Sequence, residues 1–508
     1  MKTDVLIVGS GVAGLYCALN MPQEKNVVVV TKNKACKSDS YLAQGGICVL
    51  RDEADYDAFY EDTLKAGHYE NNPDSVHIMI HSSQEVIADL VSFGVRFEKN
   101  GEQFTYTREG AHSQPRILFH EDETGKEITS HLLEAALKRD NITIIEDYTM
   151  VDLICENNEC HGIIGHDASG HYCAIQADYT VLATGGIGGI FEHSTNYRHL
   201  TGDSIALALK YGIRLRNIDY IQIHPTTLYT EKEGREFLIS ESVRGEGAVL
   251  LNGKGERFVN ELLPRDIVAN AIFAEMKKEG SKHVWLSMAP IQEEAIKSHF
   301  PNIYQRCLME GYDATREPIP VVPSQHYFMG GINVDRYSKT SMERLYAAGE
   351  TACNGVHGRN RLASNSLLES LVFAKRAARH IAEGYTALTA DVEITIDQSR
   401  YRNYKEEYKA AVLAAIEEER NSHRNSRRDN RLGRTLLHRI HDCSNRRLGM
   451  KKSSGRKLLR SIKRENIRKE SRQKQKEDAR RTPEKARALR KKQKAKRKLA
   501  KAQRRRTA

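Results

Sequence analysis

The most constraining feature of this sequence is its start, DVLIVGSGVAGLYCALN at residues 4–20. An apolar run of strand length leads directly into a turn that carries Gly9, Gly11 and Gly14, and a helical pattern follows. The first glycine permits the turn, the second lets backbone approach a pyrophosphate, and the third lets the helix pack on the strand. Backbone N–H groups at the helix start then bind the anion. The pattern predicts a dinucleotide site, although a glycine turn of this kind can also be purely structural.

Later segments repeat this pattern and indicate one nucleotide-binding domain assembled from separated pieces. NVVVVTK at 26–32 reads as a second buried strand, at the distance that a βαβ unit requires. YTVLATGGIGG at 179–189 and RLYAAGETACNG at 344–355 again run from apolar residues into glycine. ASNSLLESLVFAKRAARHIA at 363–382 reads as a long amphipathic helix. The fold class predicted is α/β, with a Rossmann-type domain formed by residues 1–217 and 328–388.

The remaining segments differ from this domain in composition and periodicity. Residues 218–327 combine polar turns with short apolar runs, which predicts an inserted α+β domain that caps the first. Residues 389–420 follow a helical pattern. Residues 421–508 contain no aromatic side chain and few apolar ones, so burial there cannot offset the entropy of ordering. This helical, basic C-terminal extension is expected to be disordered or only partly helical.

Composition fits an enzyme with an unusual tail. The chain has 508 residues, of which 40% are hydrophobic, enough for a large core. Residues 421–508 hold 35 Lys and Arg against 7 Asp and Glu, so the net charge of +11 hides an acidic body. The nine cysteines are scattered, which favours reduced thiols over a metal or disulfide framework. No apolar run reaches the ~20 residues of a membrane span and no signal peptide is evident, so a cytoplasmic protein is expected.

One position departs from the usual dinucleotide pattern. After the second strand an Asp or Glu is expected for the ribose hydroxyls, but Thr31 and Lys32 stand there. Lys32 suggests a contact with phosphate instead. SYLAQGGI, Ser40 to Ile47, offers small residues and two adjacent glycines against which a flat ring can lie. A glycine loop without a ligand remains the alternative reading of that segment.

Nine segments, in the same order, resemble the L-aspartate oxidase family, within the flavoprotein group of succinate dehydrogenase and fumarate reductase. They run over roughly residues 3 to 380 and together are very specific. The segments are GSGVAGL, SYLAQGGI, TREGAHSQPR, VLATGG, IQIHPTTLY, SVRGEGAVL, LPRDIV, QHYFMGGI and HGRNRLASNSLLES.

The resemblance implies a bound FAD. Membrane relatives attach the flavin covalently to a histidine five residues before the glutamine of their A-Q-G-G motif. Asp39 stands at that position here and cannot form the histidyl bond, so a non-covalent FAD is expected. The implied FAD-binding residues are Gly9, Ser10, Gly11, Val12, Ala13, Gly14, Lys32, Asp39, Ser40, Tyr41, Leu42, Ala43, Gln44, Gly45, Gly46, Asp203, Glu350, Ser366 and Leu367.

The same resemblance implies a site for a dianionic substrate. Arg265 resembles the family's essential arginine, which is assigned proton transfer, although an arginine is a poor simple base and would need desolvation or a relay. Arginine forks suit carboxylates because both oxygens are bound at once. Taken alone, each histidine or arginine could equally be a core residue or a solvated ion pair. The implied substrate and catalytic residues are Arg265, Glu109, His224, His326, Arg361, Tyr327 and Arg244.

Glu109, in TREGAHS, separates two chemistries. It resembles the glutamate that recognises the substrate amine, a carboxylate placed to meet the ammonium that aspartate has and succinate lacks. A surface ion pair of Glu109 with Arg108 or Arg116 is the alternative. The implied reaction is L-aspartate to iminoaspartate, with electrons passed to dioxygen, giving hydrogen peroxide, or to fumarate. The product would feed quinolinate and NAD biosynthesis, which suggests a functional link to quinolinate synthase.

Two other functions remain open at the level of sequence. A soluble fumarate reductase or succinate-oxidising flavoprotein is disfavoured by Glu109 and Asp39. A nucleic-acid-binding protein rests only on the basic tail, whose clustered Lys and Arg could release counterions from phosphates. The abrupt change of composition near Asn421 favours a translated frameshift or a solubilising extension over a nucleic-acid anchor.

Overall fold

The computed structural model describes residues 1–232, 234–388 and 394–423. Residues 1–422 form one compact unit, to which the following description applies. The predicted tail, 421–508, lies almost wholly outside the described residues. Within the described part, no helix is long and apolar enough to cross a bilayer.

A seven-stranded sheet forms the centre of this unit, in the order β7-β2-β1-β10-β9-β8, with β18 also paired to β10. Strands β7, β2, β1, β10 and β18 run parallel, whereas β9 and β8 are antiparallel to their neighbours. The strand bounds are β1 Lys2–Val8, β2 Val27–Val30, β7 Ile142–Ile145, β8 Thr149–Glu156, β9 Glu159–His166, β10 Tyr172–Leu182 and β18 Leu345–Ala347.

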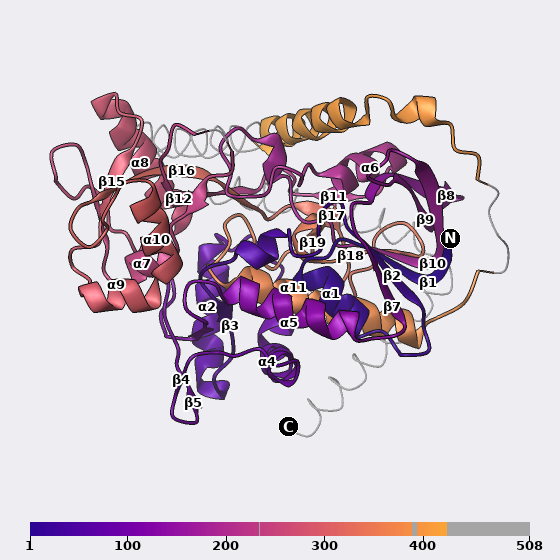
Figure 1. Ribbon diagram of the computed structural model, residues 1–508, viewed down its shortest axis with the longest axis horizontal. Coiled ribbons are helices and arrows are strands. Elements are labelled where there is room, and N and C mark those ends of the chain that lie inside the picture. The colour runs from indigo at the N-terminus through magenta and orange to yellow at the C-terminus, as the bar shows by residue number, and fades with distance from the viewer. Residues whose placement is uncertain (233, 389–393, 424–508) are drawn as a thin grey trace, which may run out of the picture. The chain divides into compact units, whose positions relative to one another are not determined.

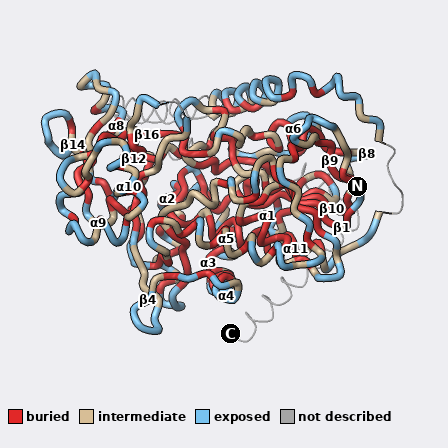
Figure 2. The backbone as a smooth tube through the Cα atoms, in the orientation of Figure 1, coloured by how far each residue is buried: buried red, intermediate tan, exposed pale blue. Residues whose placement is uncertain are grey.

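Both faces of the sheet are covered, which explains the uninterrupted apolar run of β1. Val5 and Ile7 belong to one core cluster, with helices α1 (Val12–Leu19), α5 (Thr124–Leu137) and α11 (Asn365–Glu383). Leu6 and Val8 belong to a second cluster on the opposite face, with α6 (Asp203–Tyr211). A strand buried on both faces reads as a continuous hydrophobic segment. Figure 1 shows the α1, α5 and α11 layer beside the sheet, and Figure 2 shows its buried interior in red.

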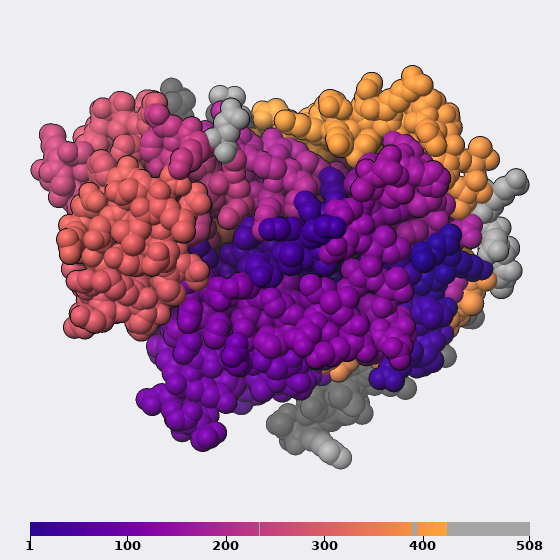
Figure 3. Space-filling view, viewed as in Figure 1, coloured from indigo at the N-terminus to yellow at the C-terminus, as the bar shows by residue number. Residues whose placement is uncertain are grey.

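A second sheet, antiparallel and five-stranded, has the order β13-β12-β16-β15-β14 and a core of its own. It is drawn in rose to salmon in Figure 1, and the atoms of this part of the chain have the same colours in Figure 3. It falls in the range predicted for the inserted segment, while the boundaries of that segment stay a prediction. The element bounds are β12 Ile221–Leu228, β13 Phe237–Leu238, α7 Glu241–Gly245, β14 Val249–Leu251, α8 Arg265–Glu279, β15 Val284–Ser287, α9 Glu293–His299, α10 Pro301–Met309 and β16 Ile319–Phe328.

The other elements are helices and short strands outside the two large sheets. Near the start of the chain the bounds are η1 Asp39–Leu42, β3 Ile47–Cys48, η2 Glu53–Asp55, α2 Tyr56–Ala66, α3 Pro73–His81, α4 Ser83–Ser92, β4 Lys99–Asn100, β5 Gln103–Phe104 and β6 Ile117–Leu118. Later in the chain they are η3 Gly188–Ile190, β11 Leu215–Arg216, β17 Gly331–Asn333, η4 Gly349–Thr351, β19 Ala352–Cys353 and η5 Gln398–Tyr401.

In the described part of the segment after α11, the helix comes late. Residues 394–397 carry no regular structure, η5 follows, and a helix occupies 404–423. Tyr401 and Tyr404 pack with Val151 and Ile164 of the strand pair β8–β9. The prediction of a helical segment over 389–420 is therefore too long at its start, and residues 389–393 lie outside the described part.

Candidate functional site

The glycine turn after β1 leaves no room for side chains. Gly9 has φ +119°, and a Cβ there would lie 2.0 Å from the carbonyl oxygen of Ala183. A Cβ on Gly14 would lie 1.9 Å from the carbonyl oxygen of Gly9, so the start of α1 packs directly on the turn. The turn and the helix contact therefore both require glycine, as the sequence pattern predicts.

A first cavity, called here the glycine cavity, opens at the turn. Gly9, Ser10 and Gly11 line it from one side, and Lys32, Lys37 and Asp203 are among its other lining residues. Val12, Ala13 and Gly14, predicted as cofactor contacts, do not line it but form the buried first turn of α1. They form the helix N-terminus, where the N–H of Val12 donates to Ser40 Oγ at 3.2 Å and where first-turn N–H groups commonly bind anions.

Lys32, predicted to contact phosphate, also binds acceptors within the protein. Its ammonium donates to Asp203 Oδ2 at 2.8 Å, to Thr201 Oγ1 at 2.8 Å and to the carbonyl oxygen of His199 at 3.0 Å. A lysine has three N–H donors, and protein acceptors engage all three. A phosphate contact from Lys32 would therefore have to replace one of these bonds.

A second cavity, called here the substrate cavity, shares Asp39 with the first. Its floor is the loop after η1: a Cβ on Gly45 would lie 2.4 Å from Glu109 Oε1, and one on Gly46 2.4 Å from the carbonyl oxygen of Leu118. Tyr41 lies in η1 but is not among its lining residues. The predicted cofactor residues that line it are Asp39, Ser40, Leu42, Ala43, Gln44, Gly45, Gly46, Glu350, Ser366 and Leu367. Figure 3 shows the indigo N-terminal segment reaching the visible face between purple and magenta segments.

Two carboxyl groups beside this floor are strongly buried. The backbone N–H of Tyr197 donates to Asp39 Oδ1 at 2.9 Å, while Oδ2 is buried without a protein partner. Burial raises the pKa of Asp39 to about 7. Burial, and next the charge of Asp39, raise the pKa of Glu350 to about 8. Both groups are thus substantially protonated near neutral pH and can donate as well as accept hydrogen bonds.

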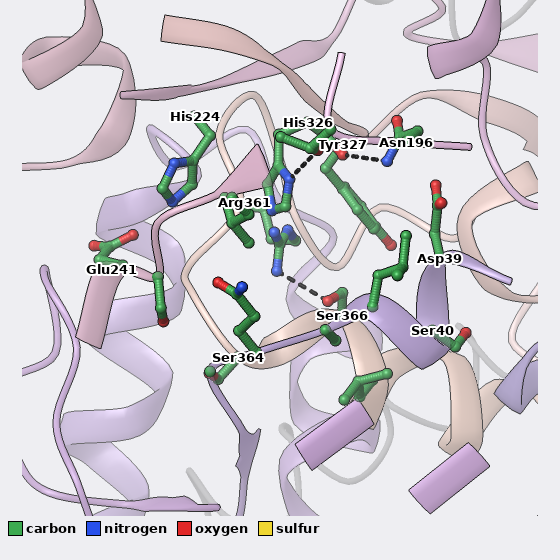
Figure 4. Close-up of a pocket in the computed structure, with 18 of the residues that line it drawn as sticks. Asp39, Ser40, Asn196, His224, Glu241, His326, Tyr327, Arg361, Ser364 and Ser366 are labelled. Carbon is green, nitrogen blue, oxygen red and sulfur yellow. Dashed lines mark hydrogen bonds between the residues drawn. The ribbon is translucent and has the colours of Figure 1, made fainter. Parts of the chain in front are cut away.

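The other wall of the substrate cavity carries cations and imidazoles (Figure 4). Arg361 donates to Ser366 Oγ at 2.9 Å and lies 4.4 Å from the centre of the Tyr327 ring, while its Nε is buried without a partner. Burial, and next Arg265, lower the pKa of Arg361 to about 10. The Arg361 guanidinium thus has an N–H donor without a protein partner, and Arg265 adds a second positive charge nearby. Both features favour an anionic ligand.

His224 on β12 and His326 on β16 lie together, with ring centres 5.0 Å apart. The backbone N–H of Thr226 donates to His224 Nδ1 at 3.2 Å, which leaves the proton of the neutral ring on Nε2, and Nε2 is buried without a protein partner. Thr195 Oγ1 lies 2.7 Å from His326 Nδ1. Burial, and next Arg265, lower the pKa of both imidazoles well below the usual value, so both are neutral at neutral pH.

Arg265, at the start of α8, belongs to a buried chain of alternating charges. Its Nε donates to Glu241 Oε2 at 2.5 Å and its Nη1 to Gln222 Oε1 at 2.9 Å. Arg244 Nη2 lies 3.6 Å from the same Glu241 oxygen. Arg265 and Glu241 line the substrate cavity, and Arg244 lies behind them without lining it.

Glu241 is the functional candidate that sequence reasoning missed. Burial alone would raise its pKa, but the charges of Arg265 and Arg244 outweigh burial and lower it below the usual value. Glu241 is therefore a buried carboxylate with two arginines. A signal existed, because Glu241 precedes Arg244 by three residues, the spacing of facing side chains on a helix.

Glu109 lies inside the cavity rather than on the surface. Its Oε1 accepts from Ser242 Oγ at 3.0 Å and its Oε2 from Ser364 Oγ at 2.5 Å. Arg116 pairs instead with Asp55 and Asp62, at 3.0 and 2.7 Å. The alternative of a surface ion pair with Arg116 is thereby excluded. Burial, and next the charge of Glu241, raise the pKa of Glu109.

Comparison with known proteins agrees with this geometry. The family model described as FAD binding domain matches residues 4–367. L-aspartate oxidase of Clostridium perfringens is 53% identical over 379 residues, which cover 74% of this chain and 86% of the relative. L-aspartate oxidase of Clostridium acetobutylicum is 51% identical over 383 residues, covering 75% and 88%.

Solved structures of the wider group share the fold. A variant of the E. coli quinol fumarate reductase has a TM-score of 0.72 and 27% identity, covering 82% of this chain and 74% of that one. Mycobacterium smegmatis Sdh1 in complex with UQ1 has a TM-score of 0.66 and 32% identity, covering 77% and 70%.

The residues present fit FAD, the cofactor that these comparisons indicate. The glycine cavity offers close-approach backbone and the N-terminus of α1 for a pyrophosphate. The substrate cavity continues from it through Asp39, and the glycines of its floor let the loop backbone lie directly against Glu109 and Leu118. The prediction of an FAD-dependent oxidoreductase is confirmed, and the chain belongs to the L-aspartate oxidase family.

Proposed function

We propose that this protein oxidises L-aspartate to iminoaspartate. FAD, when bound, supplies the acceptor for the hydride that leaves the substrate Cα. The observation that carries the proposal is the pairing of one buried carboxylate, Glu109, with a cation-rich wall across the same cavity. That arrangement complements a molecule with two carboxylates and one ammonium.

The cationic wall binds the two carboxylates. Arg361 offers its unpartnered Nε, and His224 offers its unpartnered Nε2. His326 lies beside His224 and is held at Nδ1 by Thr195. Because these groups are buried, each hydrogen bond to a charged oxygen is strong and fixes the substrate in one orientation.

Glu109 receives the ammonium. A buried carboxylate gains little from solvent, so a cation placed against it is favoured, and binding of that cation lowers the pKa of Glu109. Succinate and fumarate bring no such cation, and with them Glu109 stays a desolvated acid without a charged partner. The group therefore discriminates in favour of the amino acid.

Proton removal is assigned to Arg265 together with Glu241. Loss of a hydride from Cα and of one proton from the ammonium converts aspartate into the iminium form of the product, and a second proton leaves to give the imine. Arginine stays protonated in proteins. Arg265 can therefore accept a proton from the substrate only while it gives one of its own protons to a neighbouring group. Glu241, bonded to Arg265 and close to Arg244, is the carboxylate through which such a relay would run.

Electrons leave the protein either to dioxygen, giving hydrogen peroxide, or to fumarate. Fumarate has two carboxylates at the spacing of the substrate, so it can occupy the same cationic wall. Iminoaspartate is unstable in water, which fits a consumer such as quinolinate synthase in NAD biosynthesis. A fumarate reductase or succinate-oxidising flavoprotein is the second candidate, supported by the fold of the solved relatives and opposed by Glu109.

The proton relay is tested with Arg265→Leu and Glu241→Gln. Both variants should keep their bound FAD and lose the rate of flavin reduction by L-aspartate by at least ~100-fold, the usual size of general acid–base catalysis. Arg108→Leu, which changes an exposed arginine next to Glu109, is the matched control and should stay near the unmodified rate. Normal flavin reduction in the Arg265 variant would refute this role.

A further inference from the structure

Ser364 occupies a backbone conformation that a serine adopts rarely. It has φ +60° and is 7% exposed, directly before α11. The left-handed region costs energy for residues with a Cβ and persists where the surroundings impose it. Here the backbone N–H of Cys48 on β3 donates to the carbonyl oxygen of Ser364 at 3.1 Å. The result is a hydroxyl held at one place, 2.5 Å from Glu109 Oε2.

A second hydroxyl group contacts Glu109 from the segment that forms the five-stranded sheet. Ser242, in α7, donates to Glu109 Oε1 at 3.0 Å. Ser242 Oγ in turn receives a hydrogen bond from Ser240 Oγ at 3.2 Å, which orients it. Each carboxylate oxygen of Glu109 thus has one hydroxyl donor, and the two donors come from segments more than 100 residues apart in the chain.

The floor of the cavity leaves the Glu109 carboxylate little freedom beyond these two bonds. A Cβ on Gly45 would lie 2.4 Å from Oε1 and 3.3 Å from Ser364 Oγ, so both groups lie against the backbone of the loop after η1. Among the described residues, no cation forms an ion pair with Glu109. Its plane and position are therefore set by the two serines.

We infer that Ser364 and Ser242 are positioning residues for recognition of the substrate ammonium, acting through Glu109. By fixing both oxygens they direct the carboxylate at the ammonium and favour its charged form. They set the preference of the site for an amino dicarboxylate over a plain dicarboxylate. The inference rests on the proposed function and adds to it the residues that determine specificity.

Electrostatics around Glu109 give this arrangement a pH signature. Burial, then Glu241, raise the pKa of Glu109, while Arg265 and the hydroxyls of Ser364 and Ser242 lower it. Loss of either hydroxyl therefore raises that pKa further, so a higher pH is needed to bind an ammonium. The charged and titratable groups that face Glu109 are Glu241, Arg265, Arg244, Arg361 and Cys48.

The experiment compares Ser364→Ala, Ser364→Gly and Ser242→Ala with unmodified holoenzyme. Ser364→Gly removes the hydroxyl and also relieves the left-handed strain, so it covers a folding failure of the alanine variant. Ser338→Ala is the matched control: Ser338 is fully buried with φ +62°, but its hydroxyl donates to the Phe373 carbonyl oxygen at 3.1 Å. The readouts are KM for L-aspartate, Kd for succinate from flavin absorbance, and the pH dependence of both.

We expect KM for L-aspartate to rise at least ~10-fold at neutral pH, the loss that one hydrogen bond to a charged group produces. The acidic limb of the aspartate profile should move to higher pH, while Kd for succinate changes less than ~2-fold. In a Glu109→Gln background, the same serine substitutions should add less than ~2-fold.

Three outcomes overturn the inference. Unchanged aspartate kinetics would show that the hydroxyls are dispensable, and equal weakening of both ligands would show a structural role only. A serine effect that persists in full in the Glu109→Gln background would show that it does not act through Glu109. Unmodified enzyme whose flavin is reduced by succinate but not by L-aspartate would instead refute the proposed function, and this inference with it.

Discussion

Glu241 and Glu109, two of the buried carboxyl groups that face the substrate cavity, have neighbours that shift their pKa values in opposite directions. Two arginines lower the pKa of Glu241, whereas burial and the charge of Glu241 raise that of Glu109. Pairs of groups whose environments separate their pKa values commonly divide acid, base and binding roles. Here Glu241 suits proton relay, and Glu109 suits recognition of a cation that restores its charge.

Glu109→Gln tests this division. The amide keeps the size of the side chain but cannot pair with an ammonium, so aspartate oxidation should weaken by at least ~10-fold while fumarate reduction is spared. Steady-state assays of both reactions measure the effect. Glu102→Gln, at an exposed position seven residues earlier, is the control. Equal loss of both activities would contradict the role given to Glu109.

For single residues, the sequence predicted the site residues that stand in a distinctive local segment. It did not predict contacts with partners that are distant in the chain. Glu109, His224 and Arg361 stand in recognisable segments, and the structure brings all three to one cavity. Lys32 lines the glycine cavity as predicted for a phosphate contact, but its ion pair with Asp203, 171 residues later, has no signal in the nearby sequence. Glu241 became a candidate only when the fold brought Arg265 to it.

Among the elements, the strand–turn–helix unit was the most predictable. Its signal is local: a run of apolar residues that is buried on both faces, followed by glycines at positions where a Cβ would collide with backbone. The pairing of β18 with β10 and the antiparallel β8–β9 hairpin carry no such signal. Which strands pair there depends on how the whole core packs, and the local periodicity of a sequence does not predict it.

Helix α11 carries a buried carboxyl group that should make stability depend on pH. Burial raises the pKa of Glu369 from about 4.5 to about 7, although Asn354 donates a hydrogen bond to it. A raised folded-state pKa stabilises the fold fully below pH 4.5, and this contribution is lost as pH rises through 7. A pKa that differs by one between the folded and unfolded states changes the free energy of unfolding by about 1.4 kcal/mol.

Glu369→Gln should therefore flatten the fall in unfolding temperature between pH 5 and pH 8, by on the order of a few degrees. Thermal unfolding of the holoenzyme, followed by circular dichroism at both pH values, measures it. Glu383→Gln, an exposed position on the same helix, should behave like the unmodified protein. A variant whose unfolding temperature falls as steeply as that of the unmodified protein would contradict the assignment.

Charge is unevenly distributed along the chain: the C-terminal tail is strongly basic, and the rest of the sequence is acidic. The described fold reaches residue 423, and Val412 and Ile416 of its last helix pack into a core cluster. Among the residues that the structure describes, those lining the glycine and substrate cavities extend no further than Ser370. We therefore expect the proposed chemistry to require none of residues 424–508.

Deleting residues 424–508 should leave flavin content and turnover nearly unchanged. Flavin absorbance per mole of protein and the rate of aspartate oxidation measure both quantities, and a large loss of either would contradict the prediction. Retention on immobilised nucleic acid at increasing salt, with and without the tail, tests the remaining alternative. The deletion should abolish any such retention if the tail is its source.

The proposed reaction requires a non-covalent flavin beside a pocket that is selective for an amino dicarboxylate. Its most direct test is an anaerobic titration of the purified holoenzyme, first with L-aspartate and then, in a separate sample, with succinate. We predict that L-aspartate bleaches the visible flavin band and that succinate leaves it essentially unchanged. Bleaching by succinate but not by L-aspartate, or a colourless protein that fails to bind added FAD, would contradict it.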